Sequence, residues 1–175
     1  MKQTSAYHFE KITPHNQKDA LAVYRQNLDY FALTAEIPSL ASVAQDQATC
    51  PPQLDLEQKH FFLVTFENRP MAVVDLLTGY PEDASSYLGL LLIAEHRQGH
   101  GQKILAQLED WLRDQGFQRL ELGVLEHNVG ALAFWTAQGF RTCGKSSILL
   151  NQQSYNVIKF AKNLADKKQR RYDNS

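Results

Sequence analysis

The sequence predicts an α/β fold with a mixed, mostly antiparallel central sheet of about seven strands and about four flanking helices. Short runs rich in β-branched and aromatic residues indicate strands, and longer segments with apolar residues at helical spacing indicate helices. These segments follow one another in the order β, α, α, β-β-β, α, β, α, β-β. The 175 residues are 43% hydrophobic and 21% charged, which is typical of one globular domain. We therefore predict a single domain over residues 1–161 and a basic, frayed tail over 162–175.

The first third of the chain predicts one strand and two helices. Tyr7 to Ile12 has the composition of a strand. From Asn16 to Leu33, apolar residues recur every three or four positions, which indicates a helix. A second helix is expected over Ser39 to Gln47, and the Cys50-Pro51-Pro52 segment prevents its continuation because proline disfavours helical conformation in the preceding residue.

The middle of the chain predicts a hairpin followed by a buried strand. The runs His60 to Phe66 and Met71 to Leu77 are separated by turn-forming residues over 67–70, so we expect them to pair. Tyr87 to Ile93 is apolar on both faces, which indicates a buried central strand.

The clearest helical pattern follows this strand. Ile104, Leu105, Leu108 and Leu112 fall on one face of a helix, and Gly116 suits its left-handed end. A strand over Leu120 to Glu126 comes next, because its apolar residues alternate with Glu121 and Gly123.

The last elements are a capped helix and two strands. Asn128 can cap a helix that runs through Gln138 and stops at Gly139. Strands over Phe140 to Leu150 and Tyr155 to Phe160 follow.

Composition excludes several classes of protein. Cys50 and Cys143 are too few for a disulfide framework and lack zinc-ligand spacing, so we expect no metal site and a reducing, cytoplasmic environment. No apolar run approaches the roughly 20 residues that span a bilayer, and residues 1–10 lack a signal-peptide core. The net charge of −1 disfavours general nucleic-acid binding. We expect a soluble protein with neither membranes nor nucleic acids as partners.

A glycine-containing loop connects the buried strand to the clearest helix. Gly99 and Gly101 lack a Cβ atom, so an anion can approach main-chain N–H groups at the start of the helix. The pattern predicts a phosphate or pyrophosphate site, and a turn without ligand is the alternative. The loop matches neither of two other phosphate-binding patterns. The dinucleotide fingerprint needs a third glycine, and Ile104 stands at that position. The P-loop needs lysine and a hydroxyl residue after the last glycine, whereas Gln102 and Lys103 follow Gly101.

His96-Arg97-Gln98-Gly99-His100-Gly101 resembles the pyrophosphate-binding pattern of the GNAT superfamily of N-acetyltransferases. In that family, Gln or Arg, two residues, Gly, one residue, and Gly or Ala bind acetyl-CoA through main-chain N–H groups. His96 departs from the first position, and Arg97 lies one place late. The segment from Asn128 to Phe140, with Ala131, Phe134, Trp135 and Gly139, is similar to the family's segment beside the pantetheine arm.

The resemblance implies which residues bind acetyl-CoA. The strand before the loop would lend backbone groups to the pantetheine amides, as a sheet edge receives a peptide. Lys103 would reach the nucleotide phosphates. The implied set is Leu91, Leu92, Ile93, His96, Arg97, Gln98, Gly99, His100, Gly101, Gln102, Lys103, Asn128, Ala131, Phe134 and Trp135.

Three residues are candidates for proton transfer. Asp75 lies inside an apolar strand, where a carboxyl group is costly unless it is paired or faces a site. Glu126, at the end of a strand, is the next candidate base. Trp135 stands where many relatives carry a tyrosine thought to protonate the departing thiolate, and Tyr155 is the candidate substitute.

The resemblance implies an N-acetyltransferase that transfers an acetyl group from acetyl-CoA to a primary amine by direct attack in a ternary complex. The acceptor, a small molecule or a peptide, is left open, as are a longer acyl group and the identity of the base and acid. A homodimer is a further expectation. The alternatives are a noncatalytic acyl-CoA-binding or regulatory module and a structural domain without ligand.

Overall fold

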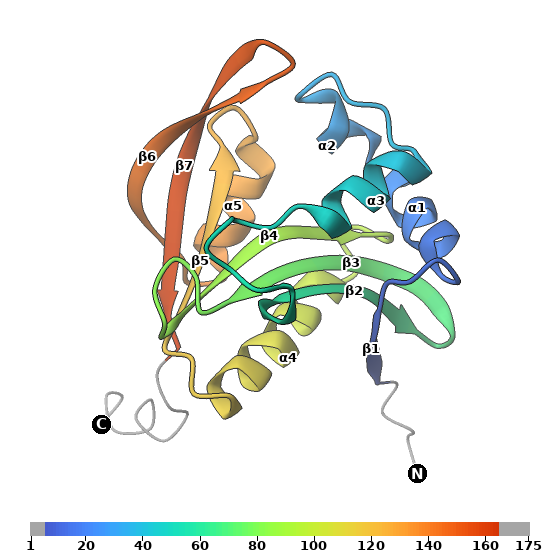
Figure 1. Ribbon diagram of the computed structural model, residues 1–175, viewed down its shortest axis with the longest axis horizontal. Coiled ribbons are helices and arrows are strands. Elements are labelled where there is room, and N and C mark those ends of the chain that lie inside the picture. Colours follow the sequence, from blue (N-terminus) through green and yellow to red (C-terminus); the bar gives the residue numbers. More distant parts are fainter. Residues whose placement is uncertain (1–5, 165–175) are drawn as a thin grey trace. The chain divides into compact units, whose positions relative to one another are not determined.

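The computed structural model describes residues 6–164 and contains a seven-stranded mixed sheet in the order β1-β2-β3-β4-β5-β7-β6 (Figure 1). It confirms the predicted fold class, with five α-helices where about four were expected. The elements are β1 (Tyr7–Lys11), α1 (Gln17–Arg25), α2 (Leu28–Ala32), α3 (Leu40–Ala48), the 3-10 helix η1 (Leu56–Gln58), β2 (Lys59–Phe66), β3 (Arg69–Thr78), β4 (Ser85–Ile93), α4 (His100–Asp114), β5 (Arg119–Leu125), α5 (Val129–Ala137), β6 (Arg141–Leu150) and β7 (Gln153–Asn163).

The described chain divides into two compact units. The first, here called the N-terminal unit, comprises residues 6–77 and 89–104. The second, the C-terminal unit, comprises residues 78–88 and 105–164. Both β4 and α4 contribute residues to each unit, and the prediction of one domain over residues 1–161 stays a prediction.

An antiparallel meander of β1, β2 and β3 forms the sheet of the N-terminal unit. Glu67 and Asn68 have positive φ angles of 51° and 60°, as a two-residue hairpin turn requires. Phe66 consequently pairs with Arg69, so β2 ends at Phe66 as predicted and β3 begins two residues before the predicted Met71.

The prediction of one continuous helix over Asn16 to Leu33 is wrong. The structure has two helices in this range, α1 and α2. Asn27 lies at the division and is buried. Its Nδ2 donates to the carbonyl oxygen of Val23 at 2.9 Å and to that of Ile93 in β4 at 3.0 Å. These two bonds satisfy the buried amide and attach the end of α1 to the end of β4.

Helix α3 matches the prediction closely, since Ser39 is its N-cap and accepts from the backbone N–H of Ser42 at 3.1 Å. In Figure 1, α1, α2 and α3 lie together at one side of the N-terminal unit. Val23 and Val43 are fully buried, which places the apolar faces of α1 and α3 in the core of this unit.

In the C-terminal unit, β4 and β5 form a short parallel ladder from Ser85↔Arg119 to Tyr87↔Glu121. Strand β5 also pairs with β7 from Arg119 to Leu125, and β6 and β7 form the long hairpin at the left of Figure 1. Lys162 and Asn163 belong to β7, so the strand continues two residues beyond the predicted start of the tail. The remainder of the predicted tail, from residue 165, lies outside the described residues.

Strand β4 begins two residues earlier than predicted and is less buried than its apolar sequence suggested. Leu88 and Leu92 are buried, but Gly89 is exposed and Leu90, Leu91 and Ile93 are partly exposed. The expectation of a strand buried on both faces is therefore wrong for its C-terminal half, which leads into the glycine loop.

Candidate active site

The glycine loop leaves β4 at Ile93 and enters α4 at His100. Arg97 and Gly99 have positive φ angles of 60° and 79°, and the N–H of Lys103 donates to the carbonyl oxygen of Gly99 at 3.2 Å. A Cβ atom placed on Gly99 would meet nothing within 4 Å, so the space beside its main chain is open. Loops with such alternating backbone conformations direct successive N–H groups toward an anion. The first turn of a helix adds donors that have no intrahelical partner.

His100 points its side chain into the N-terminal unit. The Tyr7 hydroxyl lies 2.6 Å from its Nδ1, and its ring makes an edge contact with Phe66 at a centroid distance of 5.1 Å. Glu95 lies 3.8 Å from the other ring nitrogen and 3.0 Å from the guanidinium of Arg69. His100 therefore offers the loop its main-chain N–H, and its imidazole is held by β1 and β2.

The remaining residues of the predicted loop site lie at the surface. His96, Arg97 and Gln98 are exposed, as are Gln102 and Lys103 on the first turn of α4, and Gly101 is partly exposed. The cationic side chains of Arg97 and Lys103 are thus available to an anion approaching this loop.

Leu91, Leu92 and Ile93 form the end of β4, directly before the loop. Leu92 points into the core, whereas Leu91 and Ile93 are partly exposed. The carbonyl oxygen of Ile93 accepts from Asn27, which fixes the strand end at the start of the loop.

Asp75 in β3 is held by a buried lysine. Lys59 Nζ lies 2.9 Å from Oδ1 and 2.8 Å from Oδ2 of Asp75, and the Lys59 side chain is only 4% exposed. Burial raises the pKa of Asp75, and the Lys59 ammonium partly opposes that rise. A carboxylate with a raised pKa and 17% exposure is a stronger proton acceptor than an ordinary aspartate.

A second carboxyl group, that of Asp46 in α3, belongs to the same region of the N-terminal unit. It accepts a hydrogen bond of 2.7 Å from the buried Tyr24 hydroxyl in α1. Burial raises the pKa of Asp46, and both this hydrogen bond and the charge of Lys59 act against the rise. The pKa of Tyr24 is raised by its own burial and by the neighbouring Asp46.

Glu126, in the C-terminal unit, has the opposite electrostatics. It is exposed and receives hydrogen bonds from Asn156 at 3.0 Å and Lys145 at 3.4 Å. These contacts lower the pKa of Glu126. A carboxylate stabilised in this way is a weaker proton acceptor than Asp75.

Tyr155 lies in β7 and is partly buried. Its hydroxyl donates to Gln153 Oε1 at 3.3 Å, and its ring stacks on His127 at a centroid distance of 6.0 Å. Glu126 and His127 are adjacent in sequence, so the structure brings Tyr155 near the end of β5 that carries Glu126.

The α5 segment confirms the predicted cap. Asn128 Oδ1 accepts from the N–H of Ala131 at 3.2 Å. Trp135 is buried and makes edge contacts with Phe134 and Phe140 at centroid distances of 4.9 and 5.1 Å. Its indole therefore belongs to the core of the C-terminal unit, while Ala131 and Phe134 are partly exposed.

A comparison with models of protein families decides the family. The acetyltransferase (GNAT) family matches residues 20–140, more than half of the chain and including both the glycine loop and the α5 segment. The chain belongs to the GNAT family. A comparison with curated protein sequences gave no match.

Solved structures of GNAT acetyltransferases share the fold. An acetyltransferase from Thermus thermophilus is 28% identical, with a TM-score of 0.71 over 90% of this chain and 97% of that one. A probable acetyltransferase from Chromobacterium violaceum has 10% identity and a TM-score of 0.75 over 93% and 85% of the two chains. A ribosomal-protein-alanine N-acetyltransferase from Brucella melitensis has 18% identity and a TM-score of 0.63 over 89% and 99%.

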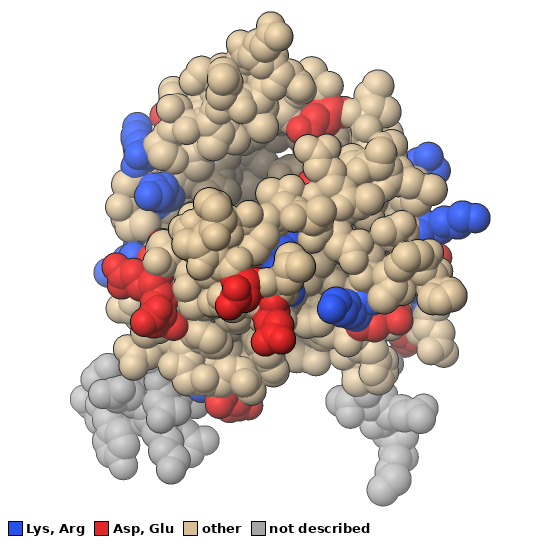
Figure 2. Space-filling view, viewed as in Figure 1, with Lys and Arg blue, Asp and Glu red and all other residues tan. Residues whose placement is uncertain are grey.

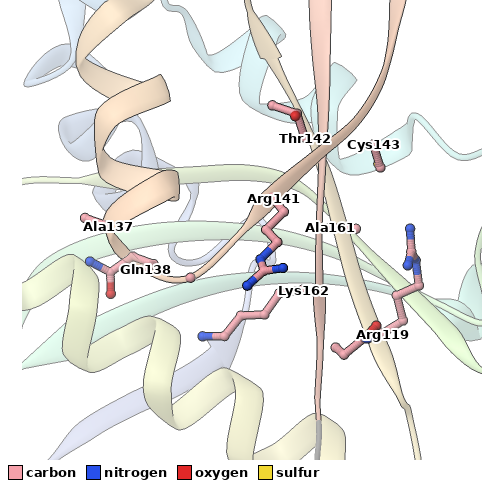
Figure 3. Close-up of a pocket in the computed structure, with 10 residues that line it drawn as sticks. Arg119, Ala137, Gln138, Arg141, Thr142, Cys143, Ala161 and Lys162 are labelled. Atoms are coloured by element: carbon pink, nitrogen blue, oxygen red, sulfur yellow. The ribbon is translucent and has the colours of Figure 1, made fainter.

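A cavity of about 510 Å³ in the C-terminal unit of this GNAT protein contains none of the predicted site residues in its wall. It lies beside the C-terminal end of α5, where Arg119, Arg141 and Lys162 extend from three strands (Figure 3). Lys162 and Arg119 pair with Glu109 and Glu121 at 2.7 and 2.6 Å. Two of the three cations are thus paired with carboxylates of the same unit.

The described residues were also compared with what a charged surface, a metal site and a membrane span require. Figure 2 shows both acidic and basic side chains on one face of the GNAT protein. Within residues 6–164, no group of His, Cys, Asp and Glu side chains is placed to hold a metal ion. In the same range, no helix is long and apolar enough to cross a membrane.

Sequence reasoning missed four residues that hold the candidate site: Tyr7, Asn27, Asp46 and Lys59. Each of them contacts a residue that is distant in the sequence. The separation is 16 positions for Lys59 and between 22 and 93 positions for the other three. A lysine at the start of an apolar strand was a usable signal for Lys59, because lysine is rarely buried unless it is paired.

Proposed function

We propose that this GNAT protein is an N-acetyltransferase that transfers the acetyl group of acetyl-CoA to a primary amine of a small molecule or peptide. The observation that carries the proposal is the open main chain at Gly99, with a φ of 79°, between β4 and the start of α4 in a chain of the GNAT family. The open space beside Gly99 and the donors of the first helical turn fit a pyrophosphate group.

The residues assigned to acetyl-CoA are those of the two segments that resemble the family's pattern. The main chain of residues 99–102 would bind the pyrophosphate, with Arg97 and Lys103 as exposed cations beside it. Leu91, Leu92 and Ile93 would offer backbone groups to the pantetheine amides, and Asn128, Ala131, Phe134 and Trp135 form the family's second segment. Acetyl-CoA supplies the acetyl group as a thioester.

Asp75 is the proposed base. An alkyl ammonium has a pKa near 10, so its nitrogen must lose a proton before it can attack a carbonyl carbon. We assign this proton to the Asp75 carboxylate, directly or through a water molecule. The C–N bond then forms as the C–S bond breaks, and a main-chain N–H near Ile93 would stabilise the developing oxyanion. Tyr155 is the proposed proton donor to the departing thiolate, and the second proton that the attacking nitrogen loses would replace the one that Tyr155 gives.

Glu126 is the second candidate base. Contacts with Asn156 and Lys145 lower the pKa of Glu126, so we prefer Asp75 as the base. Comparison of Asp75→Asn with Glu126→Gln separates the two, since only loss of the base lowers the acetylation rate without weakening acetyl-CoA binding.

The first experiment is the thermal unfolding midpoint with and without acetyl-CoA, using ATP and NAD as controls. Ligand at about 100 times its Kd stabilises the folded chain by roughly 2.7 kcal/mol, a shift of several degrees. A shift with acetyl-CoA alone, lost in Gly101→Val, supports the proposal and leads to a screen of amines for turnover. Binding without turnover would indicate the noncatalytic acyl-CoA-binding alternative. No shift with any ligand would contradict the proposal.

A further inference from the structure

Lys59 is buried to a degree that is unusual for lysine. Its side chain is 4% exposed although it stands at the first position of β2. In the β2–β3 register Lys59 opposes Leu77 and Phe61 opposes Asp75, so Lys59 and Asp75 are diagonal neighbours on adjacent strands. This geometry lets the ammonium contact both oxygens of the carboxylate, at 2.9 and 2.8 Å.

The carboxyl group of Asp75 remains accessible on the side of β4. Gly89 in β4 is exposed, and a Cβ atom at this position would lie 3.3 Å from Asp75 Oδ2. Because glycine has no side chain, no atom of residue 89 covers this oxygen. Asp75 is thus fixed by a cation on one side and uncovered beside Gly89.

Two charged groups act on Asp75: Lys59 in β2 and Asp46 in α3. Asp46 in turn accepts a hydrogen bond of 2.7 Å from Tyr24 in α1. Burial and the charge of Asp46 raise the pKa of Glu36, which is therefore a further carboxyl group beside Asp46. One ammonium therefore faces two carboxyl groups, Asp46 and Asp75, whose negative charges oppose each other.

We propose that Lys59 is a positioning residue that holds Asp75 ionised and oriented for proton removal from the acceptor amine. This inference rests on the proposed acetyl transfer. Burial alone favours the protonated acid, which cannot accept a further proton. The paired ammonium favours the carboxylate, and its contact with both oxygens restricts rotation of the group.

The inference predicts the direction of two pKa changes. Replacement of Lys59 by Met removes the positive charge, so the pKa of Asp75 rises further. The acidic limb of the kcat–pH profile moves to higher pH with it. Asp46→Asn removes a neighbouring negative charge, so the pKa of Asp75 and the acidic limb both move down.

The experiment uses the full chain as wild type, Lys59→Met, Lys59→Arg and Asp46→Asn, with folding checked by circular dichroism. The Asp75 carboxyl carbon is titrated by NMR, with its signal assigned from Asp75→Asn, and kcat is measured against pH with an amine found in the screen. We expect the pKa of Asp75 and the acidic limb of the kcat–pH profile to move up in Lys59→Met and down in Asp46→Asn. In Lys59→Arg, both should stay near their wild-type positions. If Lys59→Met does not fold, two variants still test the inference. Asp46→Asn tests the direction in which the pKa of Asp75 moves, and Lys59→Arg tests whether a positive charge at residue 59 is sufficient.

The outcomes separate this inference from the function on which it rests. A wild-type chain that acetylates no amine contradicts the proposed function, and the role of Lys59 is overturned with it. An active wild type whose acidic limb is unchanged in Lys59→Met and Asp46→Asn contradicts only the role of Lys59. In that case the pair with Asp75 is a structural ion pair.

Discussion

The Tyr7 hydroxyl lies 2.6 Å from Nδ1 of His100, joining the first strand to the first residue of α4 across 93 positions of the sequence. His100 begins α4 directly after the glycine loop, and its ring also contacts Phe66. The glycine loop is thus attached to the β1–β2 sheet of the same unit through one side chain.

Replacement of Tyr7 by Phe tests this attachment. Loss of one partly buried hydrogen bond costs about 1 kcal/mol, and if the loop loosens, acetyl-CoA binding weakens up to about fivefold. The measurement is the Kd of acetyl-CoA by calorimetry. His8→Ala is the control, because His8 is the next residue of β1 and is exposed. Equal affinities of Tyr7→Phe and wild type would show that the loop holds its shape without this bond.

Gly99 and Gly116 offer a matched pair of substitutions. Both have positive φ angles, 79° and 90°, and a Cβ atom at either would meet nothing within 4 Å. Alanine at each position therefore costs about the same backbone strain, roughly 1 kcal/mol. We expect Gly99→Ala alone to weaken acetyl-CoA binding, because only Gly99 lies in the glycine loop that is proposed to bind the pyrophosphate. Equal thermal shifts by acetyl-CoA in both variants would exclude a special role for Gly99.

Substitution of Gly89 tests access to Asp75. Alanine would place a methyl group 3.3 Å from Asp75 Oδ2, which is a tight contact that covers the carboxylate. We expect Gly89→Ala to lower kcat several-fold and to leave the Kd of acetyl-CoA unchanged. In the double variant with Asp75→Asn, the second substitution should add no further loss, since both act on one group. If the losses of kcat in the two single variants add up in the double variant, Gly89 and Asp75 act independently.

The elements with strong local signals could be predicted from the sequence. The Ile104 to Leu112 periodicity gave α4, and Asn128 gave the start of α5, because the apolar face and the cap are encoded within a few neighbouring residues. The division between α1 and α2 could not be predicted in this way. It depends on the bond from Asn27 to Ile93, which exists only after β4 has packed beside α1.

Strand register decided the rest of the candidate site. A four-residue turn over 67–70 would pair Phe66 with Met71 and place Asp75 opposite Phe62. The two-residue turn instead pairs Phe66 with Arg69, and a one-residue shift in register between Val64 and Thr65 then places Asp75 opposite Phe61. A shift of one residue exchanges the two faces of a strand, so the contact between Lys59 and Asp75 depends on the turn and on this second shift together. Asp75 was identifiable from its apolar surroundings, but its partner was not.

Glu109 in α4 is the centre of a buried ion cluster whose removal should destabilise the protein. The Glu109 side chain is 6% exposed and lies 2.7 Å from Lys162 Nζ and 3.2 Å from the Arg113 guanidinium. Arg113 Nε is already without a hydrogen-bond partner among the described residues. Glu109→Gln would leave two buried cations without this carboxylate, at a cost of about 3 kcal/mol.

The measurement is urea unfolding of Glu109→Gln, with Lys145→Ala as the matched control. Lys145 pairs with Glu126 at 3.4 Å, but the two side chains are 73% and 45% exposed. Exposed pairs contribute about 0 to 1 kcal/mol because water screens them, so Lys145→Ala should unfold near the wild-type urea midpoint. If Glu109→Gln also unfolds near that midpoint, Asp110 or solvent replaces the lost carboxylate and the cluster contributes little to stability.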